Sequence, residues 1–194
     1  KGATPVLFCF KDRMRSDAHD VVQWFIRRKM KVILLSGDRK DVVEEAAEEL
    51  GLSRFKHSCK PQDKIEVIDR MKSNGDTILM VGDGLNDAPA LSAAHVSISP
   101  SNAAEISQNA ADFIFQSQKL DSIVRAYQIS VSSRKLVFMN FGFAAAYNII
   151  AVPFAAAGML TPLVAAIAMS LSSIVVTANA LRLNFEKIYK SHDA

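Results

Sequence analysis

The sequence predicts an α/β domain with a parallel sheet, followed by a helical hairpin that spans a membrane. Two observations lead to this prediction. Over residues 1–135, short β-branched or aromatic runs alternate with amphipathic stretches, which is the pattern of strands joined by right-handed helical crossovers. From Leu136 to Leu181, by contrast, no Asp, Glu, Lys or Arg occurs. One ordinary soluble domain is therefore excluded.

Five short apolar runs are typical of buried strands, namely residues 6–10, 32–35, 77–81, 96–98 and 113–115. Helices are predicted at 17–30, at 41–50 and from Pro61 to near Gly75, because Gly51 and Gly75 suit helix ends and proline suits a first turn. The predicted inward faces of these helices are Val21, Val22, Phe25 and Ile26, then Val42, Val43, Ala46, Ala47 and Leu50, and then Ile65, Ile68 and Met71.

The uncharged run supplies two spans of roughly 20 residues, enough to cross a bilayer core about 30 Å thick. The spans are predicted at 136–158 and 162–183, with Gly158 ending the first helix, Thr161 capping the second and Pro162 in its first turn. A buried hairpin in a large soluble core is the alternative, and the length of the uncharged run argues against it.

The flanks of the hairpin set its orientation. Residues 119–135 are expected to form a stalk helix ahead of the first span, with one packing face made of Ile123, Ala126, Tyr127, Ser130 and Val131. Arg134 and Lys135 precede the first span, and Arg182, Lys187 and Lys190 lie at or beyond the end of the second, whereas the turn between the spans carries no charge. Residues 1–135 and the tail 184–194 are therefore placed in the cytoplasm.

Charge and cysteine content exclude two further classes of protein. The chain has 23 basic and 20 acidic residues, and they are nearly balanced within residues 1–135. This excludes a nucleic-acid binder that works through bulk positive charge. Cys9 and Cys59 form neither a CxxC pair nor a disulfide framework, and both are expected to be buried as small apolar residues.

Polar residues cluster where predicted strands end and helices begin, which is where parallel sheets bind ligands. Ser36, Gly37 and Asp38 follow the second strand, and a hydroxyl and an N–H beside a helix N-terminus can hold a phosphoryl oxygen. Lys64 lies in the first turn of the helix that begins at Pro61, from where it can reach a phosphate. The alternative is that Lys64 is a solvated surface residue.

The third strand ends in the loop 82–89, Gly-Asp-Gly-Leu-Asn-Asp-Ala-Pro. Asp83, Asp87 and Asn86 offer the oxygen ligands that suit Mg²⁺, and Gly82 and Gly84 permit a tight backbone around them. A turn with a helix cap at Asp87 would explain each residue separately. It does not explain the eight residues together.

This loop resembles the GDGxNDxP signature of the P-type ATPases, whose phosphorylation domain has the haloacid-dehalogenase fold. Ser36, Gly37 and Asp38 match their TGD or SGD element, and residues 61–64 match the loop with their phosphate-contacting lysine. Asp12, Arg15 and Asp17 resemble their DxxRxD segment. The resemblance implies a haloacid-dehalogenase-like domain portion, with a Rossmann-like parallel sheet, at residues 1–118.

The hairpin resembles the last two membrane helices of the heavy-metal (type IB) branch that moves Cu⁺. The matching residues are Tyr147 and Asn148 in the first span and Met169 and Ser173 in the second, which are expected to line a copper path. Met169 and Ser173 share a helix face, and a thioether is a soft ligand suited to Cu⁺. Plain helix packing is the alternative for Met169 and the neighbouring serines. Residues 36–39, 94–100 and 169–174 resemble the subgroup that supplies copper for assembly of cbb-type cytochrome oxidase.

The resemblance implies that the chain is the C-terminal third or so of a copper-exporting pump that uses Mg²⁺ and ATP, with Cu⁺ as the transported ion. Asp83 would be the principal Mg²⁺ ligand, supported by Asp87 and Asn86, while Lys64, Ser36 and the Gly37 amide would hold phosphoryl oxygens. The DKTGT segment with the nucleophilic aspartate, the nucleotide domain, the TGE loop and the CPC pair do not occur in the sequence, so the chain by itself is expected to be inactive.

The implied location is the bacterial inner membrane, and the implied partners are the lipid bilayer, the other domains of the pump and a copper chaperone. Two alternatives stay open: a non-catalytic, membrane-anchored module of the same fold, and a pump for Zn²⁺ or Cd²⁺. A phosphatase that uses Asp12 as its nucleophile is disfavoured, because Met14 stands where that fold places its general acid.

Overall fold

The chain forms two compact units, Lys1–Ile123 and Val124–Ala194, in a computed structural model that describes residues 14–159 and 161–182. The elements of the first unit are α1 (Ala18–Arg27), β1 (Leu34–Leu35), α2 (Lys40–Leu50), β2 (Phe55–Lys56), α3 (Pro61–Ser73), β3 (Leu79–Val81), the 3₁₀ turn η1 (Leu85–Asp87), α4 (Ala88–Ala93), β4 (Val96–Pro100), α5 (Glu105–Ala110) and β5 (Phe113–Phe115). The predicted strand 6–10, Cys9, Asp12 and the tail 184–194 lie outside the described residues.

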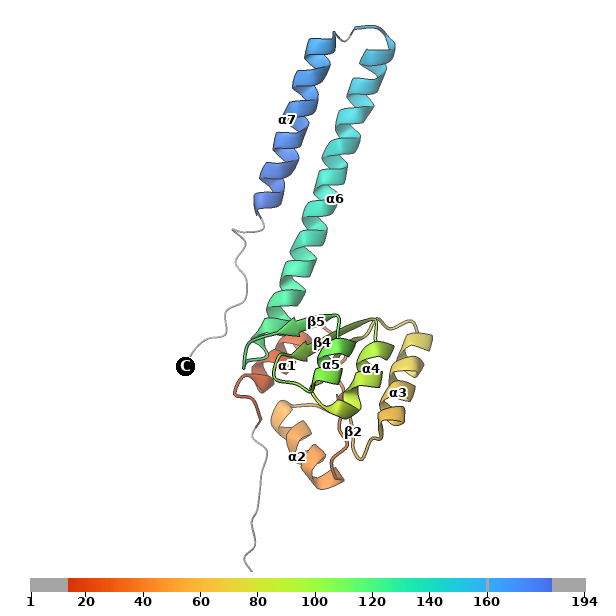
Figure 1. Ribbon diagram of the computed structural model, residues 1–194, viewed down its shortest axis with the longest axis vertical. Helices are drawn as coiled ribbons and strands as arrows, with labels where there is room; N and C mark the ends of the chain where they lie inside the picture. The colour runs from red at the N-terminus through yellow and green to blue at the C-terminus, as the bar shows by residue number, and fades with distance from the viewer. Residues whose placement is uncertain (1–13, 160, 183–194) are drawn as a thin grey trace, which may run out of the picture. The chain divides into compact units, whose positions relative to one another are not determined.

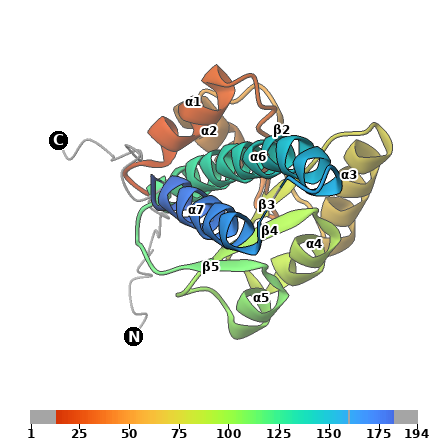
Figure 2. The same cartoon turned by 90° about the horizontal axis from the view of Figure 1, so that it is seen from above.

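All strand pairs in the described part of the chain are parallel, as predicted. β1 pairs with β2, and the other three strands form a sheet in the order β3-β4-β5. Leu79 lies opposite Val96 in this sheet, and Ile98 lies opposite Phe113. Figure 2 shows α4 and α5 beside the three-stranded sheet. The sequence analysis missed β2, because two residues are too few to show a strand pattern.

Glycines and a proline set the helix ends largely where the sequence predicts them. Gly51 follows α2 in the left-handed conformation, with φ of 67°, and Pro61 is the first residue of α3. Gly75, with φ of 83°, follows the end of α3. α1 ends at Arg27, before the predicted residue 30, because Lys29 adopts a positive φ of 61° that a helix cannot contain.

Three apolar clusters can be traced in the core of the first unit among the described residues. The first joins α1 and α2 through Ala18, Ala47 and Leu50. The second joins α3, β3 and α4 through Ile68 and Ala90, and the third contains Ile98, Phe115 and Ile123. Most of the predicted helix faces are buried or half-buried. Val42 is the exception, because it lies one position off the stripe of Val43, Ala47 and Leu50 and is exposed.

Burial of the strands was predicted wrongly in part. Leu79 and Val81 of β3 and Phe113 and Ile114 of β5 are exposed. β3 and β5 are the two edges of the described sheet, so each of them has a strand on one side only. Complete burial of β3 and β5 would require further elements beside them, and the described residues do not supply these elements.

The second unit is a helical hairpin. α6 (Asp121–Ala156) and α7 (Pro162–Leu181) run side by side, as Figure 1 shows, and both are long and apolar enough to cross a membrane. Gly158 has a φ of 70°, and the Val164 N–H donates to the Thr161 hydroxyl at 3.4 Å, so the two predicted end signals are confirmed.

The helix that contains the predicted stalk begins at Asp121 and continues into the first span without a break. Its predicted packing face holds only at the start. Ile123 is buried and Tyr127 is half-buried, whereas Ala126, Ser130 and Val131 are exposed.

Candidate phosphoryl-transfer and metal-path residues

Asp87 organises the loop that follows β3. Its Oδ1 accepts a hydrogen bond from Lys64 Nζ at 2.5 Å, and its Oδ2 accepts the Gly84 N–H at 3.2 Å. The two charged side chains are almost entirely buried, at 9% exposure for Lys64 and 13% for Asp87. Lys64 is therefore not a solvated surface residue. Because removal of one partner of a buried ion pair leaves an uncompensated charge, neither side chain can be replaced alone without a large cost.

The two loop glycines are required by the position of Asp87. A Cβ added to Gly82 would lie 2.8 Å from the Asp87 Cβ, and one added to Gly84 would lie 3.3 Å from its Oδ2. Neither glycine has a positive φ, so space and not backbone conformation explains them. The loop closes through the Asp87 N–H, which donates to the Gly84 carbonyl at 2.9 Å.

The Asp83 side chain has a different environment. Asp83 and Asn86 are exposed, and among the described residues no hydrogen bond or ion pair involves the Asp83 carboxylate. Mg²⁺ is commonly held by one or two carboxylates together with water and substrate phosphate. Asp83 fits this requirement, whereas both oxygens of Asp87 are engaged within the protein. The described residues contain no group of three acidic, His or Cys side chains that could hold a metal by themselves.

The loop after β1 is held by the segment that leads into α3. The Ser36 hydroxyl donates to Asp38 Oδ2 at 2.7 Å and accepts the Asp38 N–H at 3.2 Å. The Ser36 carbonyl accepts the Cys59 N–H at 2.9 Å, and the Asp38 carbonyl accepts the Ser58 N–H at 2.7 Å. Gly37 is exposed beside this segment, so its amide is accessible.

Cys59 belongs to the segment that holds this loop and leads into α3. Burial raises the pKa of its thiol, and the charges of Lys56 and Lys64 oppose that effect in part. The thiol is therefore neutral at physiological pH, in keeping with the predicted role as a small buried residue. The Cys59 N–H thus joins the Ser36 loop to the segment before α3, while Lys64 and Asp87 form a separate pair.

Sequence reasoning missed the residues that support these loops. Ser107 of α5 donates from its hydroxyl to the Gly84 carbonyl at 2.5 Å, and the Ala104 N–H donates to the Asp83 carbonyl at 3.2 Å. Ser58 has a positive φ of 52°. No sequence signal marks these roles, because Ser107 lies 23 residues from Gly84 and a serine in a short helix has no distinctive pattern.

Three of the four predicted copper-path residues are exposed in the hairpin. Met169 is 65% exposed, and Asn148 and Ser173 are exposed as well. The Asn148 amide donates to the Ala144 carbonyl of its own helix at 2.9 Å. Met169 and Ser173 are both exposed on α7, whereas Ser172 is half-buried.

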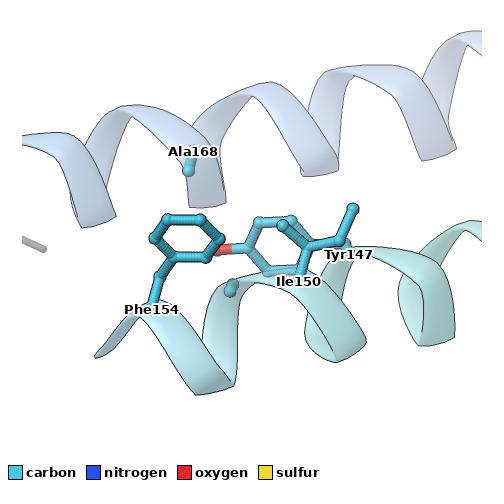
Figure 3. Close-up of a pocket in the computed structure, with 5 residues that line it drawn as sticks. Tyr147, Ile150, Phe154 and Ala168 are labelled. Carbon is cyan, nitrogen blue, oxygen red and sulfur yellow. The ribbon is translucent and has the colours of Figure 1, made fainter. Parts of the chain in front are cut away.

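Tyr147 lies between the two helices. Together with Ile150, Ala151 and Phe154 of α6 and Ala168 of α7, it lines a pocket of about 220 Å³ (Figure 3). The exposed surface of this pocket is apolar.

Comparisons with known proteins agree with the loop geometry and the hairpin. Residues 6–95 match the family of haloacid dehalogenase-like hydrolases. The chain is 45% identical over 177 residues to the nitrogen fixation protein FixI of Rhizobium leguminosarum bv. viciae, which covers 91% of this chain and 23% of FixI. It is 36% identical over 172 residues to a probable copper-exporting P-type ATPase V of Mycobacterium tuberculosis, which covers 89% of this chain and 22% of that protein.

A solved structure extends the similarity from sequence to fold. The crystal structure of a zinc-transporting PIB-type ATPase in the E2.Pi state matches with a TM-score of 0.83 and 29% identity, over 89% of this chain and 28% of that one. The chain is homologous to the P-type ATPases. The chain spans about a quarter of the length of these relatives, and it has the haloacid-dehalogenase-like fold followed by two candidate membrane helices.

Proposed function

We propose that the chain is the C-terminal, energy-coupling part of an ATP-driven Cu⁺ exporter. In the complete pump, Mg²⁺-dependent formation and hydrolysis of an aspartyl phosphate would drive transport. The observation that carries this proposal is the buried Lys64–Asp87 pair next to the exposed Asp83 carboxylate. This arrangement presents a cation and a free metal ligand at the end of a parallel strand, where such folds act on substrates.

The residues of the two loops and of α3 would have separate roles in phosphoryl transfer. Asp83 would hold Mg²⁺, which neutralises the charge that develops as the phosphoryl group is transferred in line. Asp87 orients Lys64 and closes the loop, so it supports the metal site without filling it. Lys64, the Ser36 hydroxyl and the Gly37 amide would hold the phosphoryl oxygens. The phosphorylated aspartate would come from a part of the pump outside these residues.

The hairpin would contribute one wall of the ion path. Met169, Ser173 and Asn148 are exposed in this chain, and polar groups at membrane depth usually face the interior of a bundle. We therefore assign these exposed positions, together with Tyr147, to a path completed by other helices of the pump. The relatives named as copper-exporting ATPases and the soft thioether of Met169 favour Cu⁺. The zinc-transporting relative keeps Zn²⁺ or Cd²⁺ as the alternative cargo.

The location follows from the same reasoning. Residues 1–135 and the tail 184–194 would face the cytoplasm of a bacterium, with both helices in the inner membrane. A copper chaperone would deliver the ion. The resemblance of residues 36–39, 94–100 and 169–174 favours the subgroup that supplies copper for cbb-type cytochrome oxidase.

The role of Asp83 can be tested in the full-length protein. We expect Asp83→Asn to lower the level of phosphoenzyme formed from ATP by at least about tenfold, because it removes the charged metal ligand. Asp69→Asn, at an exposed position in α3, is the matched control and should leave that level unchanged. Normal phosphoenzyme formation in the Asp83→Asn variant would refute the assignment of Asp83 to Mg²⁺.

The cargo can be tested at Met169. We expect Met169→Ala to reduce Cu⁺-stimulated ATP hydrolysis, since the thioether ligand is lost. Met159→Ala changes an equally exposed methionine in the turn between the helices, and it should have no effect. A loss of Zn²⁺-stimulated activity without any loss of Cu⁺-stimulated activity would overturn the copper assignment.

A further inference from the structure

The backbone of the metal loop is fixed from two sides. On one side the Asp87 carboxylate accepts the Gly84 N–H. On the other side the Ser107 hydroxyl donates to the Gly84 carbonyl at 2.5 Å, and the Ala104 N–H donates to the Asp83 carbonyl at 3.2 Å. The backbone carbonyl groups of Asp83 and Gly84 are therefore both held in a fixed direction.

The supporting segment is itself held in place. Gln108 donates from its side-chain amide to the Ser101 carbonyl at 3.1 Å and to the Ala103 carbonyl at 2.8 Å. The Ser107 N–H donates to the Ala104 carbonyl at 2.9 Å. These bonds fix the turn that precedes α5, so the Ser107 hydroxyl meets the loop from a rigid base.

Ser107 is fully buried, at 0% exposure. A buried hydroxyl in a helix commonly bonds to a carbonyl one turn earlier, but here it reaches another loop. Among the described side chains from outside the loop, Ser107 is the one that hydrogen-bonds to the loop backbone between Asp83 and Asp87.

We propose that Ser107 is a positioning residue for the metal-binding carboxylate of Asp83. It acts through the Gly84 carbonyl and does not touch the metal or the substrate. This inference rests on the proposed function, because it requires that Asp83 holds Mg²⁺. A flexible loop would hold the carboxylate in the correct place for a smaller fraction of the time, so loss of the Ser107 hydrogen bond weakens metal binding.

Ser99 provides a matched control. It is also a serine with 0% exposure in the same unit, but its hydroxyl has no hydrogen-bond partner in the described part of the structure. Ser99→Ala and Ser107→Ala delete the same atom from equally buried sites. Only the second deletion removes a bond to the loop.

The experiment uses the full-length protein and two measurements. The first is the binding of Mn²⁺, which takes the same oxygen ligands as Mg²⁺, followed by electron paramagnetic resonance without nucleotide. The second is the Mg²⁺ concentration that gives half-maximal phosphoenzyme from ATP. We expect Ser107→Ala to raise both the Mn²⁺ dissociation constant and the half-maximal Mg²⁺ concentration by about three- to tenfold. Ser99→Ala should change neither.

Excess Mg²⁺ separates positioning from folding. In Ser107→Ala, saturating Mg²⁺ should restore the wild-type level of phosphoenzyme, and Ser107→Thr, which keeps the hydroxyl, should bind Mn²⁺ more tightly than Ser107→Ala. The proposal is overturned if Ser107→Ala has wild-type metal affinity, or if Mg²⁺ fails to restore its phosphoenzyme.

Failure of the proposed function gives a different result. If Asp83→Asn binds Mn²⁺ as the wild type does, the assignment of Asp83 is wrong whatever Ser107 does. If Asp83→Asn loses Mn²⁺ binding and Ser107→Ala does not, the assignment of Asp83 to the metal site is supported and only the proposed role of Ser107 is wrong.

Discussion

At the scale of single residues, the candidate site depends on how closely Asp87 approaches the backbone. One carboxylate holds both a buried lysine and a loop N–H, and this is possible because Gly82 and Gly84 have no side chains in the way. A methyl group at Gly82 would come within 2.8 Å of the Asp87 Cβ, which real structures do not tolerate. Asp87 would then have to move away from Lys64.

We therefore expect Gly82→Ala to damage the site more than Gly84→Ala. The added methyl group should cost about 1–3 kcal/mol of overpacking at Gly82 and less at Gly84, where the nearest atom lies at 3.3 Å and belongs to a carboxylate end. The measurement is the level of phosphoenzyme in full-length protein, with the thermal stability of each variant. Equal losses in the two variants would contradict this explanation of the glycines.

At the scale of elements, a hydrogen bond between two side chains joins the described parts of the two hairpin helices. The Asn179 amide donates to the Asn140 side-chain oxygen at 2.8 Å, across α6 and α7, and Arg182 donates to the Asn179 oxygen at 3.4 Å. Asn179 is the one buried residue among the described side chains of α7. In a membrane, helix association depends on packing and on such hydrogen bonds, because the lipid gives no hydrophobic driving force.

A double-mutant cycle can measure this contact. We expect Asn140→Leu and Asn179→Leu each to destabilise the full-length protein in membranes by about 0.6–2 kcal/mol. The double variant should lose less stability than the sum of the two single losses, because no asparagine side chain then remains without its hydrogen-bond partner. Thermal inactivation midpoints report the loss. Ser170→Ala is the control, since the Ser170 hydroxyl bonds to Ala166 of its own helix; strictly additive effects at the two asparagines would show that the bond contributes nothing.

The parts of the structure that could be predicted are those with a local signal. Gly51, Pro61 and Thr161 mark helix ends, because their preferences depend on neighbouring backbone alone, and Ser36 and Asp83 follow the ends of β1 and β3 as expected. The Lys64–Asp87 pair and the Ser107 bond join residues 23 positions apart. Such contacts depend on how elements pack, so the identity of the side chains could not reveal them.

At the scale of the whole molecule, one helix connects the first unit to the hairpin. This helix is α6, which begins in the first unit and continues as a candidate membrane span. Its first N–H, that of Asp121, donates at 2.8 Å to a carboxylate oxygen of Asp17, which lies 104 residues earlier. Arg15 donates to the Gln118 carbonyl at 2.9 Å. The start of α1 therefore holds the start of α6.

This connection predicts a specific defect in the transport cycle. Asp17→Ala removes a carboxylate that satisfies one of the free N–H groups of the helix start, at a cost of about 1 kcal/mol. α6 would then be tied less firmly to the phosphorylation site, so a conformational change at that site would be transmitted less completely. We expect the Asp17→Ala variant of the full-length pump to form phosphoenzyme from ATP at a near-normal level but to transport fewer ions for each ATP hydrolysed.

The ratio of ion transport to ATP hydrolysis in sealed vesicles checks this expectation. Asp17→Asn keeps an oxygen acceptor of the same shape and should restore much of the ratio, whereas Asp20→Ala, at a largely exposed side chain of α1, should match the wild type. A proportional fall of phosphoenzyme and transport in Asp17→Ala would show that Asp17 only stabilises the fold. A falling ratio with intact phosphorylation would make the Asp17–Asp121 hydrogen bond part of the path by which the phosphorylation domain moves the membrane helices.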